Sequence, residues 1–262
     1  MTRTAVATPQ DLLGGALPGR IHLLTGPPGS GKTSATLQYL IDGMRGRQRA
    51  ALLTLDRPGD LRAHASHMGL DLRACVRDGR LALLRFRAQF RQRVAESASP
   101  KRMIADLEHL ITLSDLQQMR GRDAPTRLVI DPILPFLGTE PVGWALPTIV
   151  DWLDRAGVTA LLTWNGDVTA VNDRRLEPLL ERAAVILRFR HVTSQRFEMT
   201  VVRARHAIAA SPPVRFDIVP GRGIVSPSVE RRPLAPKPAA PRLEPATPVV
   251  LDFRADEARA KP

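Results

Sequence analysis

The amino-acid sequence predicts an α/β domain in which a mostly parallel sheet, covered by helices on both faces, continues into an antiparallel C-terminal extension. Two observations support this prediction. Between residues 8 and 225, short apolar runs alternate with amphipathic stretches of helical period, as in folds whose parallel strands are joined by crossover helices. The last three apolar runs are instead separated by turns alone, which is typical of antiparallel neighbours.

The elements in the first half of the domain are predicted from the turn residues that end each apolar run and from the spacing of the apolar residues. The apolar run IHLLT stops at the turn-forming residues GPP, which favours a buried strand. The segment after it repeats apolar residues at helical spacing. By the same criteria, strands are expected at 21–25, 50–55 and 81–84, and helices at 32–45, 60–68 and 101–119.

The second half first continues this alternation and then departs from it. Strands at 127–131 and 158–163, with helices at 146–156 and 175–184, are expected to complete the parallel sheet. Three runs with only turns between them then predict the antiparallel extension, at 184–189, 196–203 and 214–218.

A change of composition follows the last strand. Residues 227–248 contain seven prolines in 22 positions. Because proline cannot donate a hydrogen bond to a helix or a sheet ladder, this stretch favours an extended chain. Residues 1–225 are therefore predicted to form the folded domain, and residues 226–262 a Pro-rich, disordered tail.

Composition also limits the classes of protein. A single cysteine, Cys75, excludes an intrachain disulfide framework. The N-terminal segment lacks the apolar core of a signal peptide, and no uncharged apolar run is long enough to span a membrane. We expect a cytoplasmic protein.

The chain is basic, with 38 Lys and Arg against 26 Asp and Glu and a net charge of +12. The excess is concentrated in residues 73–102, where nine cations stand against two anions. Such a block would attract nucleic acid, an anionic membrane surface or an acidic partner protein. A solvated arginine-rich face is an equally weighted alternative, so charge alone names no partner.

A phosphate-binding motif follows the first predicted strand. Residues 26–33 read GPPGSGKT and match the pattern G-x-x-x-x-G-K-[ST]. The glycines let backbone N–H groups point inward at a helix start, where the helix dipole also favours an anion. Lys32 would reach the β- and γ-phosphates, and Thr33 would offer its hydroxyl to Mg²⁺. The motif therefore predicts ATP and Mg²⁺ as ligands, held by Gly26, Pro27, Pro28, Gly29, Ser30, Gly31, Lys32 and Thr33.

A carboxylate at the end of a neighbouring strand is the second expected part of such a site, where it binds Mg²⁺ directly or through water. Asp131 directly follows the apolar run RLVI and fits this role. A turn residue or helix cap before Pro132 is the competing interpretation.

The ordered segments resemble the KaiC-like branch of the RecA superfamily of P-loop ATPases over about residues 9–225. The segment TPQDLLGGALPGRIHLLTGPPGSGKT resembles the family's lead-in to its phosphate loop, and ALLTLDRPGDLRAHASHMGLDL resembles the part after the second strand. Four further segments follow in family order: RLVIDPILPFL, VTALLTWNGD, LEPLLERAAVILRF and VVRARHAIAASPPVRFDI. The resemblance implies a RecA-like fold, ATP as ligand and a homo-oligomer.

The resemblance also implies catalytic roles. The first of two consecutive glutamates after the second strand activates the attacking water in the family, and Asp56 stands at that position here, with Arg57 in place of the second glutamate. Asp is shorter than Glu, and we expect the neighbouring cation to make Asp56 less basic. Hydrolysis is therefore expected to be slow. A turn carboxylate that caps the helix near Pro58 is the alternative role for Asp56.

A basic pair near the last strands, Arg203 and Arg205, matches family positions that reach the γ-phosphate of a neighbouring subunit. Arginine there would stabilise charge on the transferred phosphoryl group. Two solvent-facing arginines on an edge strand are the evenly weighted alternative. Asn165 is interpreted as a γ-phosphate sensor or a turn residue, whereas His64 and His67 are assigned surface or packing roles because no third metal ligand is apparent.

Three functions are consistent with these observations. The leading one is an oligomeric ATPase that uses ATP as a conformational or assembly switch. The second is a recombination-type ATPase that binds single-stranded DNA through the basic block. The third is a nucleotide-loaded adaptor that hydrolyses little ATP and recruits a protein partner through its tail.

Overall fold

The computed structural model describes residues 19–45, 48–85, 99, 101–102, 127–136, 144–166, 176–193, 196–205 and 213–226. All of them belong to one compact unit, Met1–Val229. The strands are β1 (Ile21–Thr25), β2 (Ala50–Thr54), β3 (Leu81–Arg85), β4 (Arg127–Asp131), β5 (Thr159–Trp164), β6 (Val185–His191), β7 (Arg196–Ala204), β8 (Val214–Val219) and β9 (Gly223–Val225). The helices are α2 (Lys32–Arg45), α3 (Pro58–His67), α4 (Leu72–Arg77), η3 (Leu134–Phe136), α7 (Ala145–Ala156) and α8 (Glu177–Arg182).

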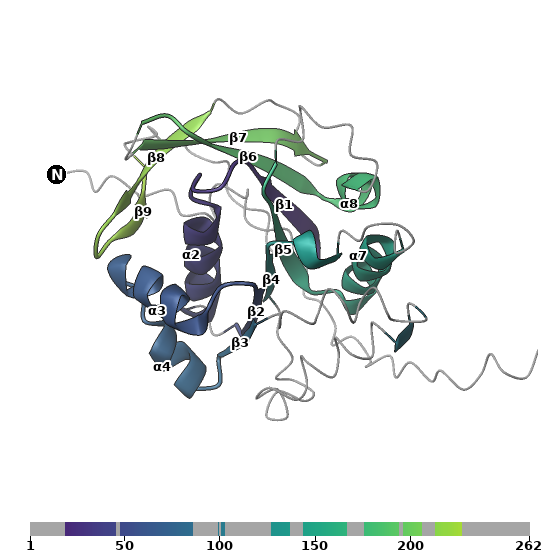
Figure 1. Cartoon of the computed structure of the whole chain (residues 1–262), viewed down its shortest axis with the longest axis horizontal. Helices are drawn as coiled ribbons and strands as arrows, with labels where there is room; N and C mark the ends of the chain where they lie inside the picture. The colour runs from purple at the N-terminus through teal and green to yellow at the C-terminus, as the bar shows by residue number, and fades with distance from the viewer. Residues whose placement is uncertain are drawn as a thin grey trace, which may run out of the picture. The chain divides into compact units, whose positions relative to one another are not determined.

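These strands form one sheet in the order β3-β2-β4-β5-β1-β6-β7-β8-β9 (Figure 1). Neighbours from β3 to β6 are parallel. Neighbours from β6 to β9 are antiparallel. The predicted α/β fold, with a parallel sheet and an antiparallel C-terminal extension, is confirmed.

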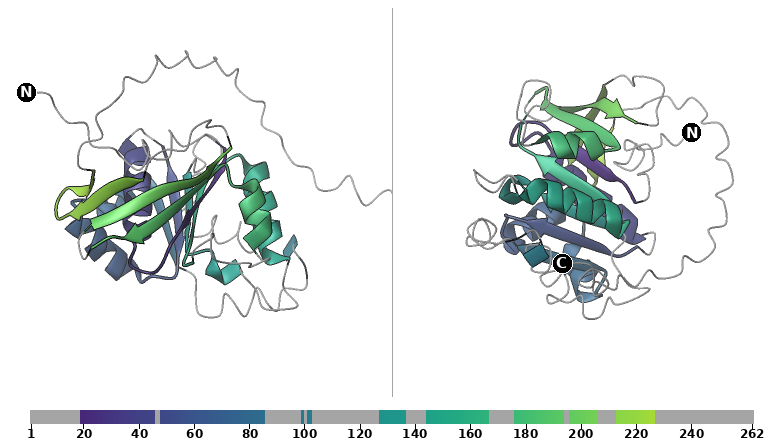
Figure 2. Two further views of the ribbon diagram at one scale, coloured as in Figure 1. Left: turned by 90° about the horizontal axis from the view of Figure 1, so that it is seen from above. Right: turned by 90° about the vertical axis from the view of Figure 1, so that its right-hand side faces the viewer.

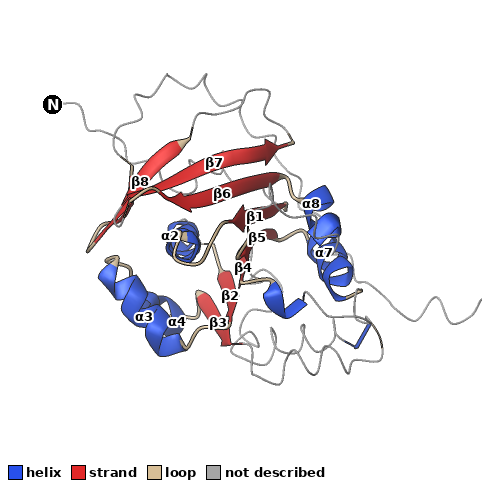
Figure 3. Cartoon of the chain, turned by 45° about the horizontal axis from the view of Figure 1, so that its top comes forward, coloured by secondary structure: helices blue, strands red, loops and turns tan. Residues whose placement is uncertain are grey.

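Helices cover both faces of the parallel strands because both faces are apolar. Helices α2, α3 and α4 lie on one face and α7 and α8 on the other (Figures 1 and 3). Successive side chains of a strand point to opposite faces, and the two cores follow this alternation. Leu24, Leu52 and Val129 pack in the core beneath α2. Their neighbours along each strand pack in the core beneath α7: Leu23, Leu53 and Ile130.

Helices α7 and α8 lie side by side, and the sheet twists beneath them (Figure 2). An ion pair joins them at the surface, with 2.8 Å between Arg182 Nη1 and Asp154 Oδ2. None of the helices placed by the structure is long and apolar enough to cross a membrane.

A buried arginine connects α2 to the start of β4. Arg127 is only 4% exposed. Its Nε donates to Gln48 Oε1 at 2.6 Å and its Nη1 donates to the carbonyl oxygen of Tyr39 at 2.7 Å. The guanidinium also lies 4.2 Å from the centre of the Tyr39 ring, within the range of a cation–π interaction. Gly43 faces this guanidinium, and a Cβ there would overlap it.

Besides the 3-10 helix η3, two elements were not anticipated from the sequence. The first is α4, which fills the segment between the predicted helix 60–68 and the strand at 81. The second is the three-residue strand β9, which pairs with β8 at the end of the sheet. The predicted helix 101–119 lies outside the described residues apart from its first two positions, and the predicted tail lies outside them from residue 227.

Candidate functional site

The GPPGSGKT loop opens on a cavity of about 450 Å³ at the carboxyl ends of the parallel strands. Open α/β sheets bind ligands at this edge. The loop follows β1, while Asp56, Asp131 and Asn165 follow or end β2, β4 and β5. The cavity is lined by Pro28, Gly29, Gly31, Lys32, Thr33, Ser34, Asp56, His64, Asp131, Pro132, Asn165, Phe197 and Ile218.

Glycine is needed at the start of the loop because the backbone passes close to another strand. Gly26 has φ 137°, and a Cβ there would overlap the carbonyl oxygen of Phe189 in β6. The Gly26 N–H donates to the carbonyl oxygen of Gly166 at 2.8 Å, which ties the loop to the turn after β5. Gly29 and Gly31 also have positive φ, 76° and 91°. Such a run of left-handed glycines turns backbone N–H groups toward a shared concavity.

The ammonium group of Lys32 lies inside this loop, and the residue is 4% exposed. It donates to the carbonyl oxygens of Gly26 and Pro27, at 2.8 Å each, and to Ser30 Oγ at 3.3 Å. Burial lowers the pKa of Lys32 to about 8, and the negative charge of Asp131 opposes this shift. A polyphosphate in the cavity would act like Asp131 and favour the charged ammonium.

Asp131 is buried at the end of β4 and is oriented by a hydrogen bond. The hydroxyl of Thr163, in β5, donates to Asp131 Oδ1. Asp131 and Thr33 line the same cavity, so a carboxylate and a hydroxyl are both available to a ligand there. Mg²⁺ prefers oxygen ligands of these kinds, and the donor set therefore fits the predicted metal. Thr163 was not anticipated, because its contact with Asp131 depends on the pairing of β4 with β5.

Asp56 lines the cavity, but the expected effect on its basicity was wrong. Its pKa is raised, first by burial and then by the charges of Asp131 and Asp60, while His64 and Arg85 oppose the shift. Arg57, which was expected to lower it, is not among the groups acting on this carboxyl. The capping alternative finds no support, since Arg57 is the N-cap residue of α3 and no side-chain hydrogen bond caps this helix.

His64 is a second residue that sequence reasoning failed to assign to this site. Its Nε2 is hydrogen-bonded to Ser34 Oγ at 2.8 Å, which joins α3 to the helix that begins at the loop. Burial lowers the pKa of His64, as does the neighbouring His67. The sequence places His64 on the helix after Asp56, which was the available indication of a role in the site. Only the packing of α3 against α2 brings it to the cavity.

The basic pair lies away from this chain's own loop. Arg203 pairs with Ile186 near the start of β6, whereas the loop follows Thr25, which is level with Arg188. Arg203 is half-buried and its Nη2 donates to the carbonyl oxygen of Ala183 at 3.1 Å. Arg205 lies one residue beyond β7 and is exposed. Strand β8 pairs with β7 only at residues 196–199. Beside Arg203, β6 is the one described neighbour of β7, so the edge-strand interpretation stays an alternative.

The antiparallel extension forms a wall of the cavity that the sequence did not indicate. Phe197 of β7 and Ile218 of β8 line it, opposite Asn165 in the turn after β5. Phe197 stacks on Phe216, with ring centres 5.4 Å apart. Ring atoms of Phe216 and the side chain of Ile218 also approach the Cβ position of Gly31. An apolar surface therefore borders the phosphate loop.

Comparison with known proteins agrees with this architecture. Two UPF0273 proteins, from Aeropyrum pernix and Pyrobaculum aerophilum, are 28% identical over 144 residues and 29% identical over 143 residues. These matches cover 53% of this chain and 57% and 50% of the two relatives, so the chain spans about half the length of the curated relatives it matches. The crystal structure of the KaiC-like protein PH0186 from Pyrococcus horikoshii has a TM-score of 0.64 at 19% identity, covering 87% of this chain and 98% of that chain, which confirms the fold.

A family model described as the KaiC ATPase matches residues 3–228. It spans most of the chain, including the phosphate loop, Asp56, Asp131 and the basic pair. The resemblance seen in the order of the segments is thereby confirmed, and the chain belongs to the KaiC family of RecA-like ATPases.

Proposed function

We propose that this chain binds Mg-ATP in the cavity at the phosphate loop and hydrolyses it slowly, as an oligomeric switch. The observation that carries the proposal is the convergence of Lys32, Asp131 and Asp56 on one cavity from three separate elements. Lys32 would bind the polyphosphate, Asp131 would bind its metal, and Asp56 would serve as the base for an attacking water.

The loop and its helix bind the phosphates in this proposal. Backbone N–H groups of residues 29–33 and the dipole of α2 favour the anion, and Lys32 adds a positive charge beside it. Thr33 and Asp131 would hold Mg²⁺, which, when bound, neutralises charge that develops on the phosphate oxygens. Phe197 and Ile218 shield the loop from water on the side of the extension.

Asp56 is the proposed general base for the attacking water. A carboxylate with a raised pKa is a stronger base than an ordinary aspartate, and burial together with Asp131 raises the pKa of Asp56. The expected slowness of hydrolysis then rests on the shorter reach of aspartate.

We expect Asp56→Asn to reduce single-turnover ATP hydrolysis by about 100-fold, because an amide cannot accept the proton. Nucleotide affinity should remain within about threefold of the wild-type value. The measurement is release of labelled phosphate under enzyme excess, alongside binding of a fluorescent ATP analogue. Asp151→Asn is the matched control, since Asp151 is exposed on α7, does not line the cavity and is not among the groups that act on Asp56.

The outcome decides between two functions. Loss of hydrolysis in Asp56→Asn alone supports a working ATPase. Equal rates in the two variants would exclude Asp56 as the base. Tight binding without turnover in the wild type would instead identify a nucleotide-loaded adaptor, and Arg57→Glu is the first change expected to restore hydrolysis.

We further propose that Arg203 and Arg205 act on the site of a neighbouring subunit. Their position on this chain supports the idea, because they lie toward the end of the sheet remote from its own loop. Lys32→Ala and the double variant Arg203→Ala/Arg205→Ala should each hydrolyse ATP poorly. Hetero-oligomers, co-expressed with two tags and purified in tandem, should regain hydrolysis, because the Lys32→Ala subunit still supplies both arginines. Purified hetero-oligomers without any gain in rate would contradict an action in trans.

A further inference from the structure

A second hollow, of about 410 Å³, lies between α3, α4 and β3. Its floor is aliphatic, formed by the half-buried Pro58, Val76 and Leu83. Its rim carries three exposed arginines, Arg62 from α3 and Arg73 and Arg77 from α4. We call this hollow the arginine groove. Among the described residues, none lines both this groove and the cavity at the phosphate loop.

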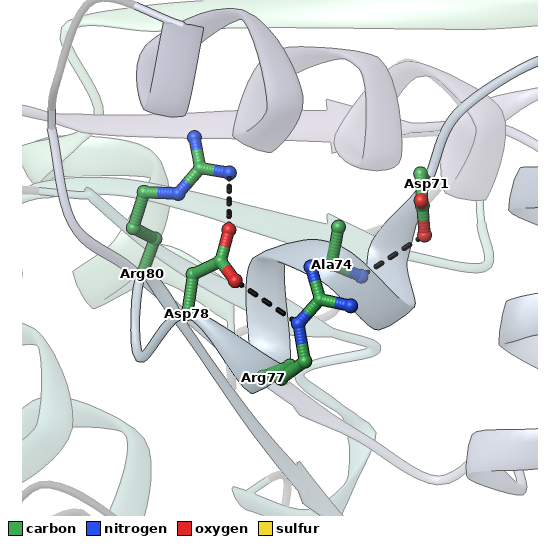
Figure 4. Close-up of polar contacts among 5 residues, drawn as sticks. All are labelled: Asp71, Ala74, Arg77, Asp78 and Arg80. Carbon is green, nitrogen blue, oxygen red and sulfur yellow. Dashed lines mark hydrogen bonds and ion pairs between the residues drawn. The ribbon is translucent and has the colours of Figure 1, made fainter.

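The nearby carboxylates neutralise only part of the rim. Asp78 pairs with Arg77 at 3.2 Å and with Arg80 at 3.1 Å (Figure 4). These two hydrogen bonds hold the pKa of Asp78 below its ordinary value. Asp71 caps α4 by accepting the N–H of Ala74 at 3.0 Å.

Two rim charges are therefore uncommitted. Within the described part of the chain, neither Arg62 nor Arg73 forms an ion pair, and no acidic residue lines the groove. The groove accordingly combines an aliphatic floor with a rim of net positive charge.

We propose that the arginine groove binds an acidic peptide segment of a partner protein, with an aliphatic side chain of the peptide on the floor and carboxylates at the rim. Arginine pairs with carboxylates through two parallel hydrogen bonds. An apolar centre surrounded by charged residues is the usual arrangement of a protein–protein contact. Arg62 and Arg73 would thus bind the acidic residues of the peptide by charge complementarity, and the floor would bind the aliphatic side chain between them.

The composition of the floor favours a peptide over nucleic acid. Proteins that bind single strands stack bases on aromatic side chains, and the floor residues that the structure describes are proline, valine and leucine. Phosphate contacts alone would leave this apolar surface exposed to water. A peptide with an aliphatic side chain covers it.

The test starts from an unbiased set of ligands. Short random-sequence peptides displayed on phage are selected on the full chain, with counter-selection on Arg62→Glu/Arg73→Glu. The selected peptides should contain acidic residues on both sides of an aliphatic residue. The strongest is then synthesised and its affinity measured by fluorescence anisotropy at low and high salt, beside a thymidine oligonucleotide.

Arg62→Glu/Arg73→Glu should weaken binding of this peptide at least about tenfold, and added salt should weaken it in the wild type. The matched control is Arg155→Glu/Arg222→Glu, which makes the same change of charge at exposed positions away from the groove. It should bind the peptide as the wild type does. Affinity for the ATP analogue should be unchanged in both double variants, so failure of this inference is separate from failure of the ATPase proposal.

Three results would overturn the inference. The first is that the selected peptides lack an acidic pattern. The second is that the two double variants bind the synthesised peptide equally. The third is that the oligonucleotide binds more tightly than the peptide and that Arg62→Glu/Arg73→Glu abolishes this binding. The last result would assign the groove to nucleic acid. Thermal unfolding of each variant shows whether the exposed substitutions leave the fold intact.

Discussion

Replacing Lys32 by alanine is expected to weaken ATP binding about 1,000-fold, because charge-assisted hydrogen bonds to two phosphates contribute about 4 kcal/mol together. The ammonium group already lies within the loop, held by the carbonyl oxygens of Gly26 and Pro27 at 2.8 Å. Its side chain therefore loses little conformational freedom when phosphates bind. Titration with a fluorescent ATP analogue in the presence of Mg²⁺ measures the effect.

Lys101→Ala provides the control for lost charge, since Lys101 is exposed and does not line the cavity. It should bind ATP as the wild type does. Equal affinity of the wild type and Lys32→Ala for the ATP analogue would show that the phosphate loop does not bind ATP. In that case the cavity would have to serve some other ligand.

Arg127→Met should lower the free energy of unfolding by about 3 kcal/mol, although Arg127 does not line the cavity. Methionine keeps the apolar stem but removes both donors, leaving the carbonyl oxygen of Tyr39 and the side-chain oxygen of Gln48 without them. Each hydrogen bond donated by a charged group contributes about 1.5–3 kcal/mol, and the lost cation–π contact with Tyr39 adds about 1 kcal/mol. Part of this cost is offset because the guanidinium no longer has to be desolvated.

Urea unfolding followed by circular dichroism is the measurement, and Tm should fall by roughly 6–12 °C for a domain of this size. The exposed Arg155 on α7 supplies the control as Arg155→Met, which should change the free energy of unfolding by less than about 0.5 kcal/mol. A similarly small effect of Arg127→Met would show that Arg127 is not needed to hold α2 against β4.

Much of the fold was predictable because local signals and tertiary context agree. The runs at 21–25 and 127–131 are buried strands with the predicted bounds, since a strand covered on both faces is apolar throughout. The phosphate loop was predictable for a different reason. Its backbone needs glycine at positions such as Gly26, so the constraint is visible in the sequence itself.

Other features depend on contacts between distant segments and leave little local trace. Helix α4 has six residues, too few for a helical period to be distinguished from a strand or a turn. His64 lines the cavity and is hydrogen-bonded there to Ser34, thirty residues earlier in the chain. The pKa of Asp56 was misjudged because its sequence neighbour Arg57 does not act on it, whereas Asp131, from another strand, does.

Strand β7 has a consequence for communication between subunits. Phe197, near its start, lines the cavity of its own chain, and Arg203 lies six residues further on, about 20 Å along an extended strand. Strand β7 pairs with β6 on both sides of a bulge between Val201 and Arg203, and with β8 at residues 196–199. If Arg203 serves the adjacent site, as proposed, a nucleotide that displaces Phe197 shifts an arginine of the next site without any intervening loop. Such an assembly would hydrolyse ATP at its sites in order around the oligomer. Its rate of hydrolysis would depend cooperatively on ATP concentration.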